Sequence, residues 1–184
     1  MPMSLLQRRP AGDTDLSEER REALCRSWYE EHGQAVYSYL RFQVDSADAA
    51  DDLTAEVFLR AVRSAGRFDP NRGAARSWLF RIAQNTLRDH LRRERRRPQV
   101  SLSDLRDLQA DGPSPEERLL WREEVGRLLA ALAELPEADR ELVSLRYGGG
   151  FSTAEVAEVL KVREAVVRTR LWRALGRLRK VLAP

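Results

Sequence analysis

The 184-residue sequence has a single cysteine, Cys25, and only two histidines, His32 and His90. One cysteine cannot form an internal disulfide, and two scattered histidines cannot complete a Cys/His zinc site. No apolar run approaches the roughly 20 residues that a membrane-spanning helix needs, and the N-terminus lacks the hydrophobic core of a signal peptide. We therefore expect a protein of the reducing cytoplasm, without membrane insertion and without a metal or other cofactor.

Motifs of enzyme chemistry are also missing. Gly148, Gly149 and Gly150 stand in a row, but the Lys-Ser/Thr pair of a phosphate-binding loop does not follow them. The two histidines have no Ser/His/Asp set around them. We therefore expect no catalytic residue in this chain.

The charges are segregated along the chain. The formal net charge is only +3, from 32 Lys and Arg against 29 Asp and Glu. Five acids and no basic residue lie in 45–56, whereas 76–97 holds eight arginines against two acids. Residues 161–180 hold eight basic residues against one acid. Two basic segments kept apart from an acidic one predict two contacts with a polyanion.

Hydrophobic residues recur at helical spacing throughout, and no strand pattern occurs, so we expect an all-α fold of two small domains. The expected parts are a loose tail (1–16), a first domain (17–97), an extended acidic linker (98–115) and a second domain (116–184). In the first domain we expect three helices. The first spans about 17–44, the second runs from a cap at Asp45 or Ser46 to a left-handed Gly66, and the third ends in the arginines before Pro98. Later helices should begin near Glu116, Pro136, Thr153 and Glu164.

The most informative segment, residues 151–175, combines a short helix, a tight turn and a longer basic helix. Ser152 and Glu155 form an S-x-x-E capping box, in which each side chain satisfies a backbone N–H at the helix start. The outer face of the second helix carries Glu164, Arg168, Thr169, Trp172 and Arg173. This pattern predicts a helix-turn-helix that places its second helix in the major groove of DNA. The alternative is a helical hairpin with a solvated charged face.

Further motifs occur in both halves of the chain. They are DAADDLTAEVFLRA (48–61), RFDP (67–70), SWLFRIAQNTLRDHLRR (77–93), LPEADREL (135–142) and RYGGGFS (146–152). In this order, and together with the helix-turn-helix, they resemble the extracytoplasmic-function (ECF) sigma factors of the sigma-70 family over nearly all of 20–182. The resemblance implies a protein that binds core RNA polymerase and directs promoter recognition, strand opening and transcription initiation.

The resemblance implies that the acidic helix binds the coiled coil of the polymerase's largest subunit. The matching residues are Asp48, Asp51, Asp52, Leu53, Glu56, Val57 and Phe58. From the residues alone, the three apolar side chains can be core, and the acids can simply favour the helix N-terminus by ~0.3–1 kcal/mol. Both interpretations can hold because they use different faces of the helix. The polymerase's beta flap is a second implied partner site.

The turn and helix that follow are implied to hold the melted strand of the minus-ten promoter element. The matching residues are Asn71, Arg72, Arg76, Trp78, Arg81, Asn85, Arg88, Arg92 and Arg93. A base held out of the stack costs a few kcal/mol, which a pocket and cationic backbone contacts must offset. From the residues alone, Trp78 can be a core anchor, Asn85 a local brace, and the run of arginines a solvated helix end.

The second helix of the helix-turn-helix is implied to read the minus-thirty-five element. The matching residues are Arg163, Glu164, Ala165, Arg168, Thr169, Arg170 and Arg173. Where the family usually has glycine in the turn, this chain has Lys161. A left-handed backbone there would cost ~1 kcal/mol, or the turn must differ. Ala165 stands where glycine or another small residue is common.

Two other classes of function stay open from the residues themselves. One is a helix-turn-helix regulator that binds duplex operator DNA without core polymerase, and the other is a helical adaptor whose basic faces bind acidic proteins. The linker resembles the segment that threads through the polymerase's channels, although an acidic linker can also stay solvated. An anti-sigma factor is a further implied partner.

Overall fold

The computed structural model describes residues 18–72, 74–95 and 115–183, and no strand occurs within them. The first unit contains α1 (Glu18–Arg41), α2 (Ala47–Ser64) and α3 (Ala75–Glu94), with the short 3-10 turns η1 (Ala65–Arg67) and η2 (Pro70–Arg72) between the last two. The second unit contains α4 (Pro115–Ala133), α5 (Glu137–Val143), the π-helical turn η3 (Ser144–Gly148), α6 (Thr153–Leu160) and α7 (Glu164–Leu182). The all-α expectation is confirmed. The predicted tail lies outside the described residues, as does the predicted linker up to 114.

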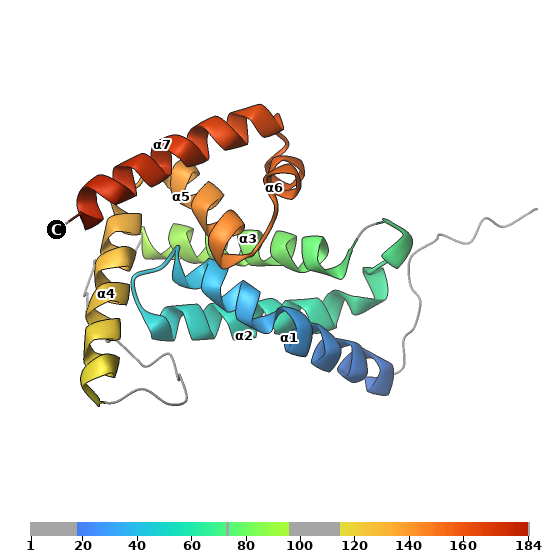
Figure 1. Ribbon diagram of the computed structural model, residues 1–184. Coiled ribbons are helices and arrows are strands. Elements are labelled where there is room, and N and C mark those ends of the chain that lie inside the picture. The colour runs from blue at the N-terminus through green and yellow to red at the C-terminus, as the bar shows by residue number, and fades with distance from the viewer. Residues whose placement is uncertain (1–17, 73, 96–114, 184) are drawn as a thin grey trace, which may run out of the picture.

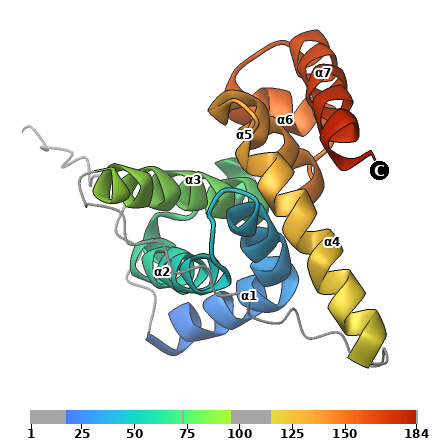
Figure 2. The same cartoon turned by 90° about the vertical axis from the view of Figure 1, so that its left-hand side faces the viewer.

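Helix α3 occupies the middle of the molecule. Figures 1 and 2 show it between the α1–α2 pair and the α5–α7 part of the second unit, while α4 runs along one end. Its buried side chains are Leu79, Phe80, Ala83, Gln84, Thr86 and Leu87. The buried face of α3 is broad because the helix packs on both units. This packing fixes the direction in which the outer face of α3 points.

Helix α2 begins where the sequence predicted and ends differently. Ser46 is the N-cap, and its hydroxyl accepts a hydrogen bond from the Ala49 N–H at 3.1 Å. The prediction that Gly66 ends the helix in a left-handed conformation is wrong, because Gly150 is the only described glycine with a positive φ. The chain instead tightens into η1, where the Phe68 N–H donates to the Ala65 carbonyl at 3.0 Å. Shorter 3-10 bonds thus satisfy carbonyls that a left-handed cap would otherwise serve.

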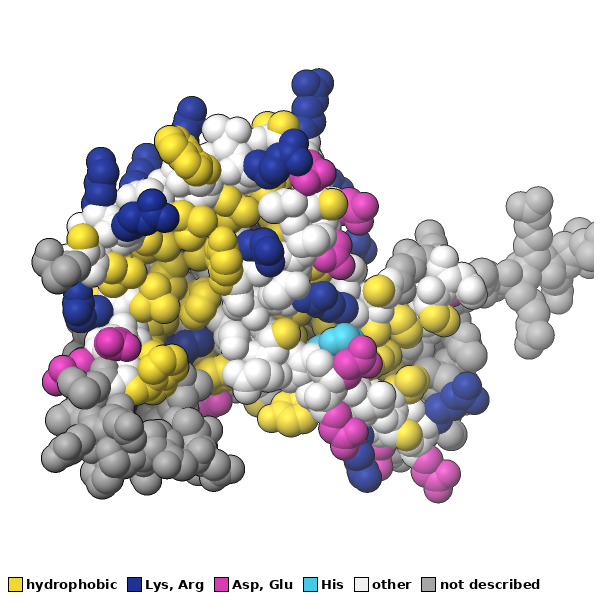
Figure 3. Space-filling view, viewed as in Figure 1, with side chains coloured by type: hydrophobic (Ala, Val, Ile, Leu, Met, Phe, Trp, Pro, Cys, Tyr) yellow, Lys and Arg dark blue, Asp and Glu magenta, His cyan; other side chains and the backbone are white. Residues whose placement is uncertain are grey.

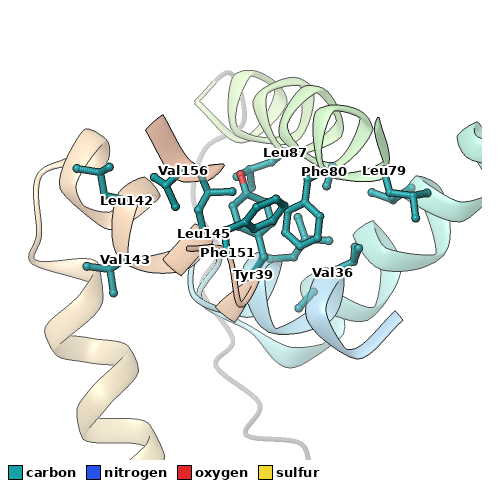
Figure 4. Packing of buried hydrophobic residues seen from close by; sticks show 14 of the residues in the cluster. Val36, Tyr39, Leu79, Phe80, Leu87, Leu142, Val143, Leu145, Phe151 and Val156 are labelled. Carbon is teal, nitrogen blue, oxygen red and sulfur yellow. The ribbon is translucent and has the colours of Figure 1, made fainter. Parts of the chain in front are cut away.

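One hydrophobic cluster connects the two units. Figure 4 shows Tyr39 of α1, Phe80 of α3, Leu145 of η3 and Phe151 meeting at its centre. All four side chains have an exposed fraction of 0%. Phe80 packs edge-on against Phe151, with ring centroids 4.6 Å apart, and against Tyr39 at 5.4 Å. The predicted domains therefore share part of their cores in this structure.

Candidate polymerase and nucleic-acid interfaces

The helix-turn-helix begins with the predicted capping box. The Ser152 hydroxyl accepts from the Glu155 N–H at 3.2 Å, and the Glu155 carboxylate accepts from the Ser152 N–H at 2.7 Å. The hydrogen bond that the Ser152 backbone N–H donates to this carboxylate, followed by the contribution of the Ser152 side chain, lowers the pKa of the Glu155 carboxyl. Helix α6 ends at Lys161, which has φ 55° and ψ 44°. The chain therefore keeps the left-handed turn without glycine and accepts a backbone cost of about 1–2 kcal/mol.

The outer face of α7 presents polar and basic groups away from the core. Val167, Leu171, Ala174 and Leu178 hold the inner face. Figure 3 shows Lys and Arg side chains projecting along α7 at the top of the molecule. Arg163 and Arg173 are exposed and make no hydrogen bond or ion pair with other described residues. Such free guanidinium groups can donate to guanine edges or phosphates.

Three other predicted residues of this helix are tied to neighbours. Arg168 donates to the Glu164 carboxylate at 3.1 Å, and the same oxygen accepts from Thr153 of α6 at 2.9 Å. The Thr169 hydroxyl donates to the Ala165 carbonyl at 2.9 Å. Glu164 thus braces α7 against α6 at the point where the recognition helix starts.

Arg170 is bonded to α5 in this structure, and its predicted role at the minus-thirty-five element stays a prediction. Its guanidinium donates twice to Asp139 of α5, at 2.9 and 2.7 Å. Arg177 donates to the other Asp139 oxygen at 3.1 Å, and the Asp139 side chain is only 14% exposed. Arg170 is therefore an anchor between α5 and α7. It follows Thr169 in the sequence, and helical spacing turns it toward the core side.

Trp172, which the sequence placed on the outer face but which was not among the residues matched to the minus-thirty-five element, is the most exposed aromatic side chain of α7. Its exposed fraction is 76%, and it follows Ala165 and Arg168 at helical spacing on the outer face. A large apolar side chain in the middle of a basic helix face indicates a surface that is covered when a partner binds. The helical spacing of the sequence already predicts this exposure, because Trp172 lies opposite the buried positions of α7.

Helix α3 carries a second basic face. Arg81, Asn85, Arg88 and Arg92 are all exposed and follow one another at spacings of four, three and four residues. Arg88 donates to the Asn85 side-chain oxygen at 3.0 Å, whereas Arg81 and Arg92 make no bond with other described residues. Arg93 lies beside this row and contacts the Asp89 carbonyl at 3.3 Å and the Glu56 carboxylate at 3.9 Å. The row can track an anionic backbone over about three helical turns.

Two residues predicted for the minus-ten site are engaged elsewhere in this structure. Trp78 is partly buried in an aromatic cluster with Trp28 at 5.1 Å and Phe68 at 5.3 Å, as its core interpretation predicted. The Arg76 guanidinium donates to the Gly149 carbonyl and lies 4.2 Å from the centre of the Phe151 ring. Arg76 therefore contacts the second unit and is partly buried there.

The turn before α3 contains two residues predicted for the minus-ten site, Asn71 and Arg72. Asn71 is exposed, and its N–H donates to the Asp69 carboxylate at 2.9 Å, which fixes the start of η2. The backbone of Arg72 belongs to η2, but its side chain lies outside the described residues. The predicted roles of both residues stay predictions.

Helix α2 separates acids and apolar residues onto two faces. Asp48, Asp51 and Asp52 are exposed, while Leu53, Val57 and Phe58 have exposed fractions of 3%, 0% and 5%. These three apolar residues belong to the core, as their core interpretation predicted, and their contact with the polymerase stays a prediction. Leu59, 55% exposed, lies on the same side of α2 as these acids.

Glu56 is the fourth predicted acid on α2 and is already paired. It accepts from Arg60 at 2.6 and 3.0 Å, and Arg60 reaches Asp89 of α3 at 3.0 Å. This chain of ion pairs ties α2 to α3. The exposed acids of α2 are consequently those of its earlier turns, Asp48, Asp51 and Asp52.

The comparisons with known proteins agree with this architecture. Residues 28–97 match the family profile for sigma-70 region 2, and residues 126–178 match that for sigma-70 region 4. The chain is 30% identical over 156 residues to ECF RNA polymerase sigma factor SigX of Bacillus subtilis, covering 83% of the chain and 80% of SigX. It is 34% identical over 163 residues to SigL of Mycobacterium tuberculosis, covering 87% of the chain and 89% of SigL.

Another relative is longer than this chain. ECF sigma factor BldN of Streptomyces coelicolor is 33% identical over 180 residues, which are 98% of the chain but 65% of BldN. Among solved structures, CnrH in complex with the cytosolic domain of CnrY is 25% identical, with a TM-score of 0.62 and coverage of 90% and 91%. The sigma factor RpoE of Bartonella quintana, in complex with the anti-sigma factor NepR, is 20% identical, with a TM-score of 0.66 and coverage of 85% and 95%. This chain belongs to the ECF sigma factors of the sigma-70 family.

None of the helices in 18–72, 74–95 and 115–183 is long and apolar enough to cross a membrane.

Proposed function

We propose that this sigma factor binds core RNA polymerase, brings it to promoters and helps to open the DNA strands there, acting in the cytoplasm where transcription takes place. The observation that carries the proposal is the pair of separate basic faces on α3 and α7, together with an exposed acidic face on α2. A duplex-binding regulator needs the face on α7 but gives no role to the other two. The operator-binding alternative is accordingly not favoured.

The acidic face of α2 is the proposed docking surface for the polymerase. Asp51 and Asp52 are exposed near the start of the helix, and Leu59 lies further along the same side. Carboxylates on a fixed helix steer a basic partner, and an apolar side chain beside them gains free energy when it is covered. Leu53, Val57 and Phe58 contribute by holding this helix in place.

The outer face of α3 is proposed to hold the unpaired strand of the minus-ten element. Arg81 and Arg92 have free guanidinium groups, and the Asn85–Arg88 pair lies between them. Cationic groups along a helix neutralise successive phosphates, and the Asn85 amide can read the edge of an unstacked base. Arg76 can join this surface only after it leaves Gly149.

The outer face of α7 is proposed to read duplex DNA at the minus-thirty-five element. Arg163 and Arg173 are free, while Glu164 orients Arg168. Trp172 stands between the basic groups, where an aromatic ring can pack against sugars or a thymine methyl group. The sigma factors to which this chain belongs are not enzymes, and we propose no catalytic step for it. An anti-sigma partner stays a prediction.

In vitro transcription tests the proposal directly. Core polymerase is mixed with a pool of genomic fragments, with and without the chain, and transcript starts are mapped. We expect starts that appear only with the chain. Duplex binding by the chain alone, without any core-dependent transcript, would instead support the operator-binding alternative.

A charge reversal then tests the docking surface. Asp51→Arg with Asp52→Arg should weaken core binding at least tenfold, because two attractive charges become repulsive. Glu19→Arg with Glu22→Arg is the matched control, since these acids are also exposed on a helix but lie at the start of α1. Equal effects of both double variants would remove α2 as the specific docking site.

A further inference from the structure

Thr153 of α6 joins the two helices of the helix-turn-helix at the end where α7 begins. Its hydroxyl donates to the Glu164 carboxylate at 2.9 Å, and the acceptor, Oε1, also accepts from Arg168 at 3.1 Å. Figure 1 shows α6 beside the start of α7. The three residues Thr153, Glu164 and Arg168 thus form a series, called here the Thr153 relay. Thr153 is not among the residues matched to the minus-thirty-five element, because its bond to Glu164 spans 11 residues and two helices.

Glu164 depends on this support because the start of α7 offers little else to hold it. Arg163 is the N-cap of α7, and its side chain makes no capping hydrogen bond. The helix dipole favours a carboxylate near the N-terminus but does not select one rotamer. The bond from Thr153 does select one, because it ties Oε1 to a fixed point on the neighbouring helix. That point is held in turn by the capping box of Ser152 and Glu155.

The relay leaves hydrogen-bonding groups available on both of its outer members. The Glu164 side chain is 42% exposed, and its second oxygen, Oε2, makes no hydrogen bond with other described residues. The Arg168 side chain is 64% exposed, and only its Nη1 group is bonded to another described residue. In the major groove a carboxylate accepts from the N4 amine of cytosine, and a guanidinium donates to O6 and N7 of guanine. The relay therefore presents an acceptor for cytosine and donors for guanine.

The spacing of the two outer members matches the spacing of bases. Residues four apart lie on one face of a helix, and Glu164 and Arg168 are about 6 Å apart along the axis of α7. Successive base pairs are about 3.4 Å apart along a duplex. The first residues of a recognition helix are those that contact base edges. Glu164 and Arg168 can consequently face bases that lie within about two base-pair steps.

We propose that Thr153 is a positioning residue for promoter reading. It holds Glu164 so that Oε2 accepts from a cytosine amine, while Arg168 donates to a guanine within two base pairs. The proposal rests on the proposed function of α7. The exposed pair of Glu164 and Arg168 is weak, so DNA can draw Arg168 away at small cost. Thr153 meanwhile keeps the carboxylate in place, so fewer side chains have to be ordered when DNA binds.

Thr153→Val tests the relay with little change in the shape of the side chain. Valine keeps the β-branched outline but has no hydroxyl donor, and Thr153→Ser is the matched control because it keeps the donor. Each variant is assembled with core polymerase. Holoenzyme binding is then measured on a promoter mapped by transcription, with every single base change across the minus-thirty-five element. Salt dependence and circular dichroism distinguish lost base reading from lost phosphate contacts or lost folding.

We expect the wild type and Thr153→Ser to prefer one cytosine and one guanine within two base pairs of each other. Thr153→Val should lower both preferences at least threefold and leave the other positions, the salt dependence and the helical content unchanged. In an Arg168→Ala background, Thr153→Val should cause no further loss at the guanine, because the relay no longer ends in a donor. Glu164→Gln should move the cytosine preference toward adenine, since a side-chain amide pairs with N6 and N7 of adenine.

Two results would overturn the relay. One is a base preference of Thr153→Val equal to that of the wild type, and the other is a loss that is equal at every position or equal in Thr153→Ser. If Thr153→Val loses helical content, Glu164→Gln decides the matter, and an unchanged cytosine preference in that variant contradicts the relay. Failure of the proposed function looks different. Arg168→Ala then leaves the guanine preference unchanged, or the wild type gives no core-dependent transcript, and the relay is contradicted with it.

Discussion

Helices α3 and α7 each contain five arginines but hold them differently. In α7, Asp139 binds Arg170 and Arg177, and Glu164 binds Arg168, so most guanidinium groups are fixed by carboxylates. In α3, Arg81 and Arg92 make no bond with other described residues, and the helix is fixed instead by its apolar face. Two of the three paired arginines of α7 contact Asp139 of α5, so carboxylates hold this helix on its neighbours, whereas apolar packing holds α3.

The largest expected effect comes from removing the apolar support of α3. Phe80→Ala deletes a fully buried ring that touches Tyr39 and Phe151, and should lower the free energy of unfolding by about 3–5 kcal/mol. Urea denaturation measures the loss. Trp172→Ala, which removes a larger but exposed side chain from α7, should change stability by no more than about 0.5 kcal/mol. Similar losses for the two variants would mean that the core does not fix α3 as described.

The second-largest loss of stability is expected when α7 loses the carboxylate that holds it on α5. Asp139→Ala leaves Arg170 and Arg177 without their acceptor, and we expect a loss of about 2–3 kcal/mol because the pair is partly buried. Asp89→Ala is the control, since its pair with Arg60 is more exposed and should be worth no more than about 1 kcal/mol. If Asp89→Ala costs as much, ion pairs do not distinguish the two helices.

Arg168→Ala tests whether the fixed guanidinium groups of α7 read bases. We expect a loss of about 1–2 kcal/mol in holoenzyme binding to the minus-thirty-five element, with relaxed preference at one position. The loss stays in the lower part of the range for a base contact because Arg168 must first weaken its bond to Glu164. Binding to a panel of promoter variants measures it. A uniform loss over all variants, with a smaller salt dependence, would instead identify a phosphate contact.

Lys161→Gly should have the smallest effect, and it should raise the free energy of unfolding. Glycine relieves the left-handed backbone at φ 55° but loses more entropy on folding, so the net stabilisation should be about 0.5–1 kcal/mol. Thermal unfolding measures it, and Lys161→Ala, which keeps a Cβ atom, should give no such gain. A loss of stability on changing to glycine would show that the Lys161 side chain itself holds the turn.

The sequence predicted best what depends on local spacing. The all-α fold, the Ser46 cap and the capping box of Ser152 and Glu155 all follow from i, i+3 and i+4 relations. The turn between α6 and α7 is short, and few backbone conformations can close it, which accounts for the left-handed conformation of Lys161.

What the sequence missed depends on contacts between distant segments. Arg170 resembles its basic neighbours, and only the position of α5 reveals that Asp139 binds it. Arg76 and Glu141 likewise acquire their partners from the other unit, 73 and 57 residues away in the cases of Gly149 and Gln84. For Leu53, Val57 and Phe58 the sequence left both a core role and a partner contact open, because an amphipathic helix can bury its apolar face inside the protein or against a partner.

The central claim is that α3 holds a single strand while α7 holds a duplex, and strand opening measures this most directly. Asn85→Ala with Arg88→Ala is assembled into holoenzyme, and permanganate footprinting of unpaired thymines is done on a paired promoter and on one mismatched across the minus-ten region. We predict near-normal polymerase binding and upstream contact, reduced opening on the paired promoter, and at least partial recovery of transcription on the mismatched one, where the unpairing cost is already met. Opening of the paired promoter as efficient as in the wild type would contradict the claim.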